Sequence, residues 1–224
     1  MTNTNPIIVA LDVPSLDEAR ALATTLGDSV GGLKVGLELY SAHGPDAVRA
    51  FDGHSIFLDL KLHDIPTTVA RALTSLRPLR VELLTVHTLG GRAMLEAAND
   101  AKRDERILGV TILTSLDDDA LAELGLPPAK ESVPMLAELA FASGCDGVIC
   151  APADIEAVRA VCPEPFLIVV PGSRPEGSSA DDQARVLTPR AAIAAGADRL
   201  VIGRPITRAD DPRAAALSIL QGLR

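Results

Sequence analysis

Two kinds of hydrophobic pattern alternate along the chain. Short runs rich in Val, Ile and Leu are typical of buried strands, and longer alanine-rich stretches carry apolar residues at helical spacing. The short runs predict strands over residues 7–12, 32–36, 56–62, 82–87, 107–113, 147–150, 166–171 and 199–203. The longer stretches predict helices over residues 16–26, 46–51, 67–76, 92–102, 133–143, 153–161, 189–195 and 213–221. Since no linker or low-complexity block interrupts the alternation, we expect residues 1–224 to form a single domain.

The alternation amounts to eight strand–helix pairs, which is the pattern of a (β/α)8 TIM barrel in the α/β class. A doubly wound parallel sheet is the structural alternative. That fold would carry a glycine-rich phosphate turn after the first strand, and Asp12-Val13-Pro14-Ser15 is not such a turn. We therefore predict the barrel.

Charge and cysteine content narrow the possible partners. The chain has 21 Lys and Arg against 30 Asp and Glu, and its basic residues form no stripe, so we expect neither nucleic acid nor a membrane surface as a partner. The first residues lack a basic segment followed by an apolar one, and no apolar run approaches the roughly 18 residues of a membrane span. We expect a cytoplasmic protein with Cys145, Cys150 and Cys162 as buried reduced thiols.

Two of the four lysines interrupt apolar strands. Lys34 lies in the run Gly32–Gly36, and Lys61 lies in Ile56–Leu62. An unpaired ammonium group is costly to bury, so both side chains need a partner or a function. In a barrel of this kind the active site lies at the carboxyl ends of the strands. The polar residues at those predicted ends are Asp12, Lys34, Asp59, Lys61, Asp64, His87, Thr114, Arg174 and Arg204.

The third predicted strand carries the densest group of charges. Side chains alternate along a strand, so Asp59 and Lys61 should point together into the barrel mouth while Leu58, Leu60 and Leu62 face the helices. A structural ion-pair network is one interpretation of this group, and a catalytic array is another. A magnesium site on Asp59 and Asp64 is less favoured, because the lysines already neutralise these carboxylates.

Two small-residue loops predict a phosphate site. Pro171-Gly172-Ser173-Arg174 follows the seventh strand and Gly203-Arg204 follows the eighth, which is where barrels hold phosphate groups on backbone N–H donors and a guanidinium. Exposed arginines in ordinary turns are the alternative. The stretch 172–187 is long enough for a lid, from which Gln183 could reach a ligand.

Three ordered motifs together resemble a known family. They are the Asp-x-Lys-x-x-Asp signature of Asp59, Lys61 and Asp64, the phosphate segment Pro171–Pro175 and the phosphate segment Ile202–Pro205. The chain resembles bacterial orotidine 5'-phosphate decarboxylases over nearly its whole length. The resemblance implies a homodimeric carboxy-lyase without metal or cofactor. Such an enzyme converts orotidine 5'-phosphate to uridine 5'-phosphate and CO2 in pyrimidine biosynthesis, by direct decarboxylation and protonation at C6.

The same resemblance implies a role for each matched residue. Lys61 corresponds to the proton donor, Asp59 and Lys34 to its charged partners, and Asp64 with Thr68 to side chains supplied across the dimer. The remaining matched positions would bind substrate: Asp12 and Thr114 at the sugar and base, and Arg174, Gln183, Gly203 and Arg204 at the phosphate. The departures, Leu62 and Thr67, affect no charged position.

Two other functions remain as alternatives. Magnesium-dependent sugar-phosphate enzymes of the same superfamily share the Asp-x-Lys-x-x-Asp signature, but they carry an acidic metal ligand where this chain has Lys34. A noncatalytic nucleotide-binding barrel is the second alternative, and it would not require the complete set of Lys34, Asp59, Lys61 and Asp64.

Overall fold

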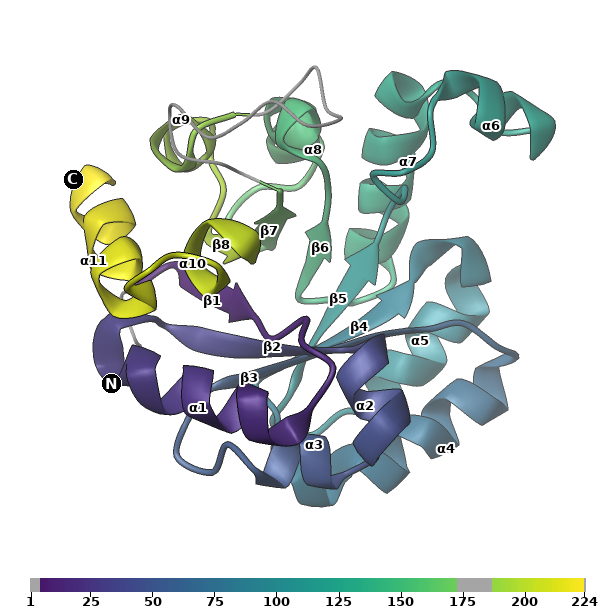
Figure 1. The fold of residues 1–224 in the computed structure, drawn as a ribbon. Coiled ribbons are helices and arrows are strands. Elements are labelled where there is room, and N and C mark those ends of the chain that lie inside the picture. The colour runs from purple at the N-terminus through teal and green to yellow at the C-terminus, as the bar shows by residue number, and fades with distance from the viewer. Residues whose placement is uncertain (1–4, 173–186, 224) are drawn as a thin grey trace.

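The computed structural model describes residues 5–172 and 187–223. In this part of the chain, eight parallel strands follow one another around a closed barrel (Figure 1). The barrel closes where Val9 of the first strand pairs with Ile202 of the last. The strands are β1 Ile7–Ala10, β2 Gly32–Gly36, β3 Ile56–Leu62, β4 Leu83–His87, β5 Arg106–Val110, β6 Gly147–Ile149, β7 Leu167–Pro171 and β8 Arg199–Ile202. The predicted (β/α)8 TIM barrel is confirmed.

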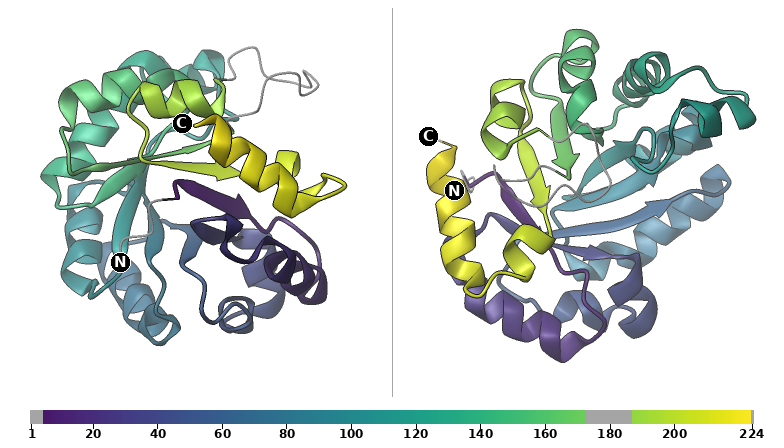
Figure 2. Two further views of the ribbon diagram at one scale, coloured as in Figure 1. Left: turned by 90° about the vertical axis from the view of Figure 1, so that its left-hand side faces the viewer. Right: turned by 45° about the horizontal axis from the view of Figure 1, so that its top comes forward.

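Helices pack around the outside of the strands (Figure 2). They are α1 Leu16–Leu26, α2 Leu37–His43, α3 Asp46–Arg49, α4 Pro66–Leu76, α5 Arg92–Ala101, α6 Asp118–Glu123, α7 Ala129–Ala142, α8 Ile155–Val161, α9 Pro189–Ala194, α10 Arg204–Thr207 and α11 Pro212–Gly222. Short 3-10 helices cover Gly27–Ser29, Arg77–Leu79, Thr88–Gly90 and Pro152–Asp154. Because all eight strands are parallel, the connections from each strand to the following helix lie on the same rim of the barrel.

The observed elements differ from the predicted ones mainly in the connections. Helices α2, α6 and α10 have seven, six and four residues, too few to show a helical repeat in the sequence. Strand β5 ends at Val110 rather than at residue 113, because the chain turns onto the rim, where Ile112 lines a cavity. Helix α7 begins four residues before the predicted start at 133 and contains Pro134.

Side-chain caps explain where several helices begin. Ser15, Asp117 and Asp211 each accept a hydrogen bond from the backbone N–H three residues later, at the starts of α1, α6 and α11. Gly27 ends α1 with φ of 50°, a conformation that favours glycine. These contacts satisfy backbone groups at the helix ends that have no partner within the helix.

Two apolar cores hold the barrel together. The larger core lies between the strands and the helices and contains Leu58, with Leu60 and Leu62 packed against it. The smaller core fills the barrel interior and consists of Ile8, Ala10, Phe57, Leu83, Leu108, Val169 and Val201. The predicted outward direction of the three leucines of β3 is therefore confirmed. The interior core forms the floor beneath the polar residues of the rim.

Gly147 on β6 offers a test of this close packing. A Cβ atom there would lie 2.6 Å from the Cβ of Leu167 on the neighbouring strand and closer still to its carbonyl oxygen. We expect Gly147→Ala to lower the free energy of unfolding by about 1–3 kcal/mol, because strand backbone cannot move aside cheaply. Thermal melts followed by circular dichroism measure this. Gly222→Ala in α11, where a Cβ meets nothing within 4 Å, is the control and should leave Tm unchanged or slightly higher. Equal Tm values for the two variants would contradict the packing argument.

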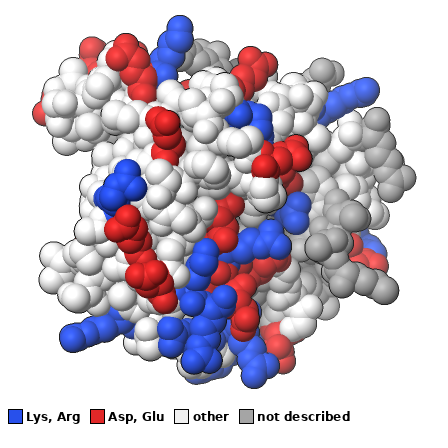
Figure 3. Space-filling view, turned by 180° about the vertical axis from the view of Figure 1, so that it is seen from behind, with Lys and Arg blue, Asp and Glu red and all other residues white. Residues whose placement is uncertain are grey.

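Surface charges are mixed on the face shown in Figure 3. Lys and Arg side chains gather near its lower edge, and Asp and Glu side chains adjoin them directly. The longest helix among the described residues, α7, has 14 residues, and none of the described helices combines the length and apolarity needed to cross a bilayer.

Candidate active site

A cavity of about 500 Å3 opens at the carboxyl ends of the strands. Its lining combines apolar residues of the barrel floor, such as Phe57 and Val201, with polar residues of the rim. The predicted site residues that line it are Asp12, Lys34, Asp59, Lys61, Thr114, Gly203 and Arg204. The structure thus brings together residues from five of the eight strand ends.

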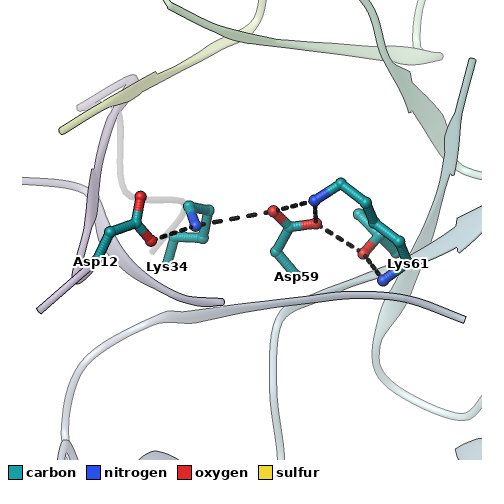
Figure 4. Close-up of polar contacts among 5 residues, drawn as sticks. Asp12, Lys34, Asp59 and Lys61 are labelled. Atoms are coloured by element: carbon teal, nitrogen blue, oxygen red, sulfur yellow. Dashed lines mark hydrogen bonds and ion pairs between the residues drawn. The ribbon is translucent and has the colours of Figure 1, made fainter. Parts of the chain in front are cut away.

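Four of these residues form a chain of alternating charge across the cavity (Figure 4). The Nζ atom of Lys34 lies 2.9 Å from Asp12 Oδ1 and 3.8 Å from Asp59 Oδ2. The Nζ atom of Lys61 lies 2.9 and 2.8 Å from the two carboxylate oxygens of Asp59. Lys34 and Asp59 are only 11% and 12% exposed, so their charges are stable there because each faces opposite charges. Lys61 is 31% exposed and borders the open part of the cavity.

Gly36 makes room for this chain of charges. A Cβ atom at Gly36 would lie 2.9 Å from Lys34 Nζ and 3.2 Å from Asp12 Oδ1. The space left by this glycine is therefore occupied by the ion pair itself.

Lys61 has an unusual backbone conformation. Its φ is 49°, and the register of β3 against β4 shifts between Leu58 and Leu62. The backbone N–H of Lys61 donates a hydrogen bond to the hydroxyl oxygen of Thr85, 2.9 Å away, and that hydroxyl lies 3.0 Å from Asp59 Oδ1. Sequence reasoning missed Thr85. The sequence does contain a signal that could have identified Thr85: it is a polar residue two positions before His87, on the inward face of an otherwise apolar strand.

His87 ends β4 beside this cluster. Its ring stacks on that of His63, with 5.3 Å between the centroids, and its Nδ1 accepts a hydrogen bond from the Leu89 N–H. Burial lowers the pKa of His87, and the nearby His63 and Lys61 lower it further. The imidazole is therefore neutral at pH 7 and adds no positive charge next to Lys61.

Another part of the cavity wall is formed by the described residues of the predicted phosphate segments. Gly172, Gly203 and Arg204 line it, and Arg204 begins α10 as an exposed side chain. Within residues 5–172 and 187–223, Arg204 forms no ion pair. Its guanidinium is available to an anion. Arg174 and Gln183, also predicted for this site, lie outside the described residues.

Comparison with known proteins gives the family. A model described as "Orotidine 5'-phosphate decarboxylase / HUMPS family" matches residues 5–219. The chain belongs to this family. It is 49% identical to a curated "Orotidine 5'-phosphate decarboxylase" of Thermobifida fusca, covering 98% of this chain and 96% of that protein. It is 50% identical to the protein of the same name from Trichlorobacter lovleyi, covering 95% and 92%.

Solved structures of the decarboxylase family agree with this assignment. Orotidine 5'-phosphate decarboxylase from Lactobacillus acidophilus has a TM-score of 0.87 and 37% sequence identity, covering 98% of this chain and 99% of that one. The corresponding enzyme from Pyrococcus horikoshii has a TM-score of 0.82 and 28% identity, with 97% and 99% coverage. The suspected resemblance is therefore confirmed over the length of the barrel.

Two residues to which the resemblance assigns a role do not line the cavity. Asp64 and Thr68, at the start of α4, are exposed and are not among the cavity-lining residues. The Asp64 carboxylate accepts a hydrogen bond from the Ile65 N–H, and Ile65 itself is 65% exposed. A single chain therefore does not bring Asp64 to Lys61.

The three cysteines are buried thiols, and one of them, Cys150, lies at the cavity wall. Cys145, Cys150 and Cys162 are free and buried, as predicted. Burial raises the pKa of the Cys145 and Cys162 thiols to about 11 and raises that of Cys150 as well, so all three are protonated at neutral pH. In the described segments, no three His, Cys, Asp or Glu residues are grouped as metal ligands.

Proposed function

We propose that the charged cavity decarboxylates orotidine 5'-phosphate to uridine 5'-phosphate, as a carboxy-lyase of pyrimidine biosynthesis that uses no metal or cofactor. The observation that carries this proposal is the alternating chain of Asp12, Lys34, Asp59 and Lys61 in the cavity of a decarboxylase-family barrel. Curated relatives at about half identity bear this activity in their names.

Lys61 is the proposed proton donor. Loss of CO2 from C6 leaves an electron pair in an sp2 orbital that the pyrimidine ring delocalises poorly. A cation about 4 Å from that pair is worth roughly 4 kcal/mol at an effective dielectric of 20. Both oxygens of Asp59 hold the Lys61 ammonium in place, so little reorganisation is needed when the negative charge appears. The same ammonium then supplies the proton that C6 takes up.

Asp59 and Lys34 support this proton donor. Asp59 faces both ammonium groups and is nearly buried, so its negative charge compensates their positive charges inside the cavity. Repulsion between Asp59 and the substrate carboxylate is a secondary contribution to the proposal. Lys34 connects Asp59 to Asp12, which together with Thr114 is proposed to contact the sugar and base.

The phosphate group is proposed to bind on the opposite side of the cavity. Gly203 and Arg204 line that side, and Arg174 and Gln183 are proposed to join them from the segment outside the described residues. Binding energy from a phosphate far from C6 can be used to organise the site rather than only to tighten binding.

A change in ultraviolet absorbance of orotidine 5'-phosphate on addition of the pure protein tests the activity, with and without EDTA. We expect the change to occur at the same rate in both. Loss of the change in EDTA would support the magnesium-dependent alternative. No absorbance change with or without EDTA, while nucleotide binding is still measurable, would support a noncatalytic nucleotide-binding barrel. Lys34 argues against the magnesium-dependent enzyme, because its ammonium already lies between two carboxylates.

Asp64 and Thr68 are proposed to act in the neighbouring site of a homodimer. Both are exposed at the carboxyl end of β3, and the ends of β2 and β4 on either side carry exposed Leu37 and Leu89. Exposed apolar residues around a polar group are typical of an interface between protein chains. The cavity is then completed by the partner's carboxylate.

Mixed dimers test this arrangement. Chains with Asp64→Ala and chains with Lys61→Ala, unfolded together and refolded in equal amounts, should recover about a quarter of the wild-type rate. Random pairing makes about half the dimers hybrid, and each hybrid has one intact site. Steady-state rates of the mixture and of each variant alone provide the measurement. No recovery in a mixture shown to contain hybrid dimers would mean that Asp64 serves its own chain.

A further inference from the structure

Thr85 lies at the only shift of register that the structure records among the strand pairs of the described barrel. On one side of the shift Leu58 pairs with Leu84, and on the other Leu62 pairs with Val86. Strand β3 thus has three residues between these pairs, 59 to 61, where β4 has Thr85 alone. Both charged residues of β3 lie in this bulge, so one residue of β4 faces the two groups proposed to handle the reacting carbon.

The bulge forces Lys61 into a conformation that its side chain disfavours. A non-glycine residue with φ near 49° is uncommon and costs about 1–3 kcal/mol, so it persists only where the surroundings hold it. Here the backbone N–H of Lys61 donates to Thr85 Oγ1 rather than to a carbonyl of β4. Thr85 is completely buried, so solvent does not compete for this contact.

The direction of the hydrogen bonds makes Thr85 a link between Lys61 and Asp59. Its hydroxyl has one proton and accepts from the Lys61 N–H, so the proton is donated to Asp59 Oδ1, 3.0 Å away. The same Oδ1 accepts a hydrogen bond from Lys61 Nζ. A closed ring results, drawn in Figure 4, in which one threonine hydroxyl ties the backbone of Lys61 to the carboxylate that holds its ammonium.

We infer that Thr85 is a positioning residue for the proposed decarboxylation, which sets the location of the Lys61 ammonium and the rotation of the Asp59 carboxylate. The inference rests on the proposed function. Thr85 acts through its hydroxyl: it restrains both ends of the Lys61 side chain and leaves substrate contacts to other residues. A displacement of about 1 Å at a reacting group can reduce a rate by roughly a hundredfold.

Three variants test the hydroxyl. Thr85→Val keeps the shape and removes both hydrogen bonds, Thr85→Ser keeps the hydroxyl, and Thr111→Val is the matched control. Thr111 is also completely buried, and its hydroxyl donates to the Ile149 carbonyl rather than to the charged cluster. We expect Thr85→Val to lower kcat by about 10- to 100-fold with KM changed less than about threefold, because the proposed ribose and phosphate contacts are unchanged. Thr85→Ser should stay within about fivefold of wild type in kcat, and Thr111→Val within about twofold.

Each outcome bears on one proposal. If the wild-type protein does not decarboxylate orotidine 5'-phosphate, the proposed function fails. If the wild type is active and Thr85→Val keeps its kcat, or if Thr85→Ser loses as much as Thr85→Val, the inference about Thr85 is wrong. Melting temperatures of Thr85→Val and Thr111→Val separate positioning from stability, and similar values are expected. Should Thr85→Val not fold, Thr85→Ala is measured in its place, and a wild-type kcat in that variant overturns the inference.

Discussion

Replacement of Lys61 by alanine is expected to leave a folded protein that binds nucleotide but decarboxylates at least about 10,000-fold more slowly. Two contributions are lost together. The charge next to the developing electron pair accounts for roughly 4 kcal/mol, or about a thousandfold in rate, and a positioned proton donor accounts for about 10²- to 10⁴-fold. The absorbance assay gives the rate, and calorimetry with uridine 5'-phosphate gives the binding.

Lys130→Ala serves as the control for Lys61→Ala. Lys130 is an exposed residue of α7 that is not among the residues lining the cavity, so its removal should not change kcat. Thermal melts of Lys61→Ala show whether the protein stays folded when Asp59 keeps only Lys34 and Thr85 as partners. Turnover close to wild type in a folded Lys61→Ala protein would remove Lys61 from the role of proton donor.

The second large effect is expected from Arg204→Ala, which should lower kcat/KM by about 100- to 10,000-fold without changing the fold. A guanidinium can hold a phosphate through two charge-assisted hydrogen bonds, each worth about 1.5–3 kcal/mol. Arg204 lines the cavity and has no ion-pair partner among the described residues, so its replacement breaks no ion pair within them.

Steady-state kinetics at several substrate concentrations measure the effect of Arg204→Ala on kcat and KM separately. Because binding energy from the distant phosphate can organise the site, we expect kcat to fall and KM to rise. Arg49→Ala is the control, since Arg49 is an exposed residue of α3 paired with Asp46. Unchanged kinetics in Arg204→Ala would place the phosphate elsewhere.

The sequence alone predicts the barrel and the residues of its charged cluster. Hydrophobic periodicity locates all eight strands, and two lysines in apolar runs mark the site because a buried ammonium needs compensation. Strand alternation places Asp59 and Lys61 on one face, and the structure confirms that they contact each other. These predictions succeed because they depend on local patterns of polarity.

Other features depend on contacts between strands and are hidden from such patterns. The bulge in β3 and the positive φ of Lys61 arise from pairing with β4, so alternation predicts the face but not the conformation. Thr85 gains its importance only from that pairing. The space beside Gly36 is taken by Lys34, which no linear spacing reveals. Asp64 is exposed in the single chain, and its proposed role requires a second copy.

The apolar plug inside the barrel has a consequence for the fate of carbon dioxide. Ile8, Leu108 and Val169 belong to the residues that fill the space below the charged cluster, so the described part of the barrel is packed with apolar side chains on that side. In the proposed reaction we therefore expect CO2 to leave through the cavity mouth that also admits the nucleotide, and to lie next to the carbanion until it does. Recombination of CO2 with the carbanion then competes with protonation at C6. In the proposed mechanism, the Lys61 ammonium must protonate C6 before CO2 adds back to the carbanion.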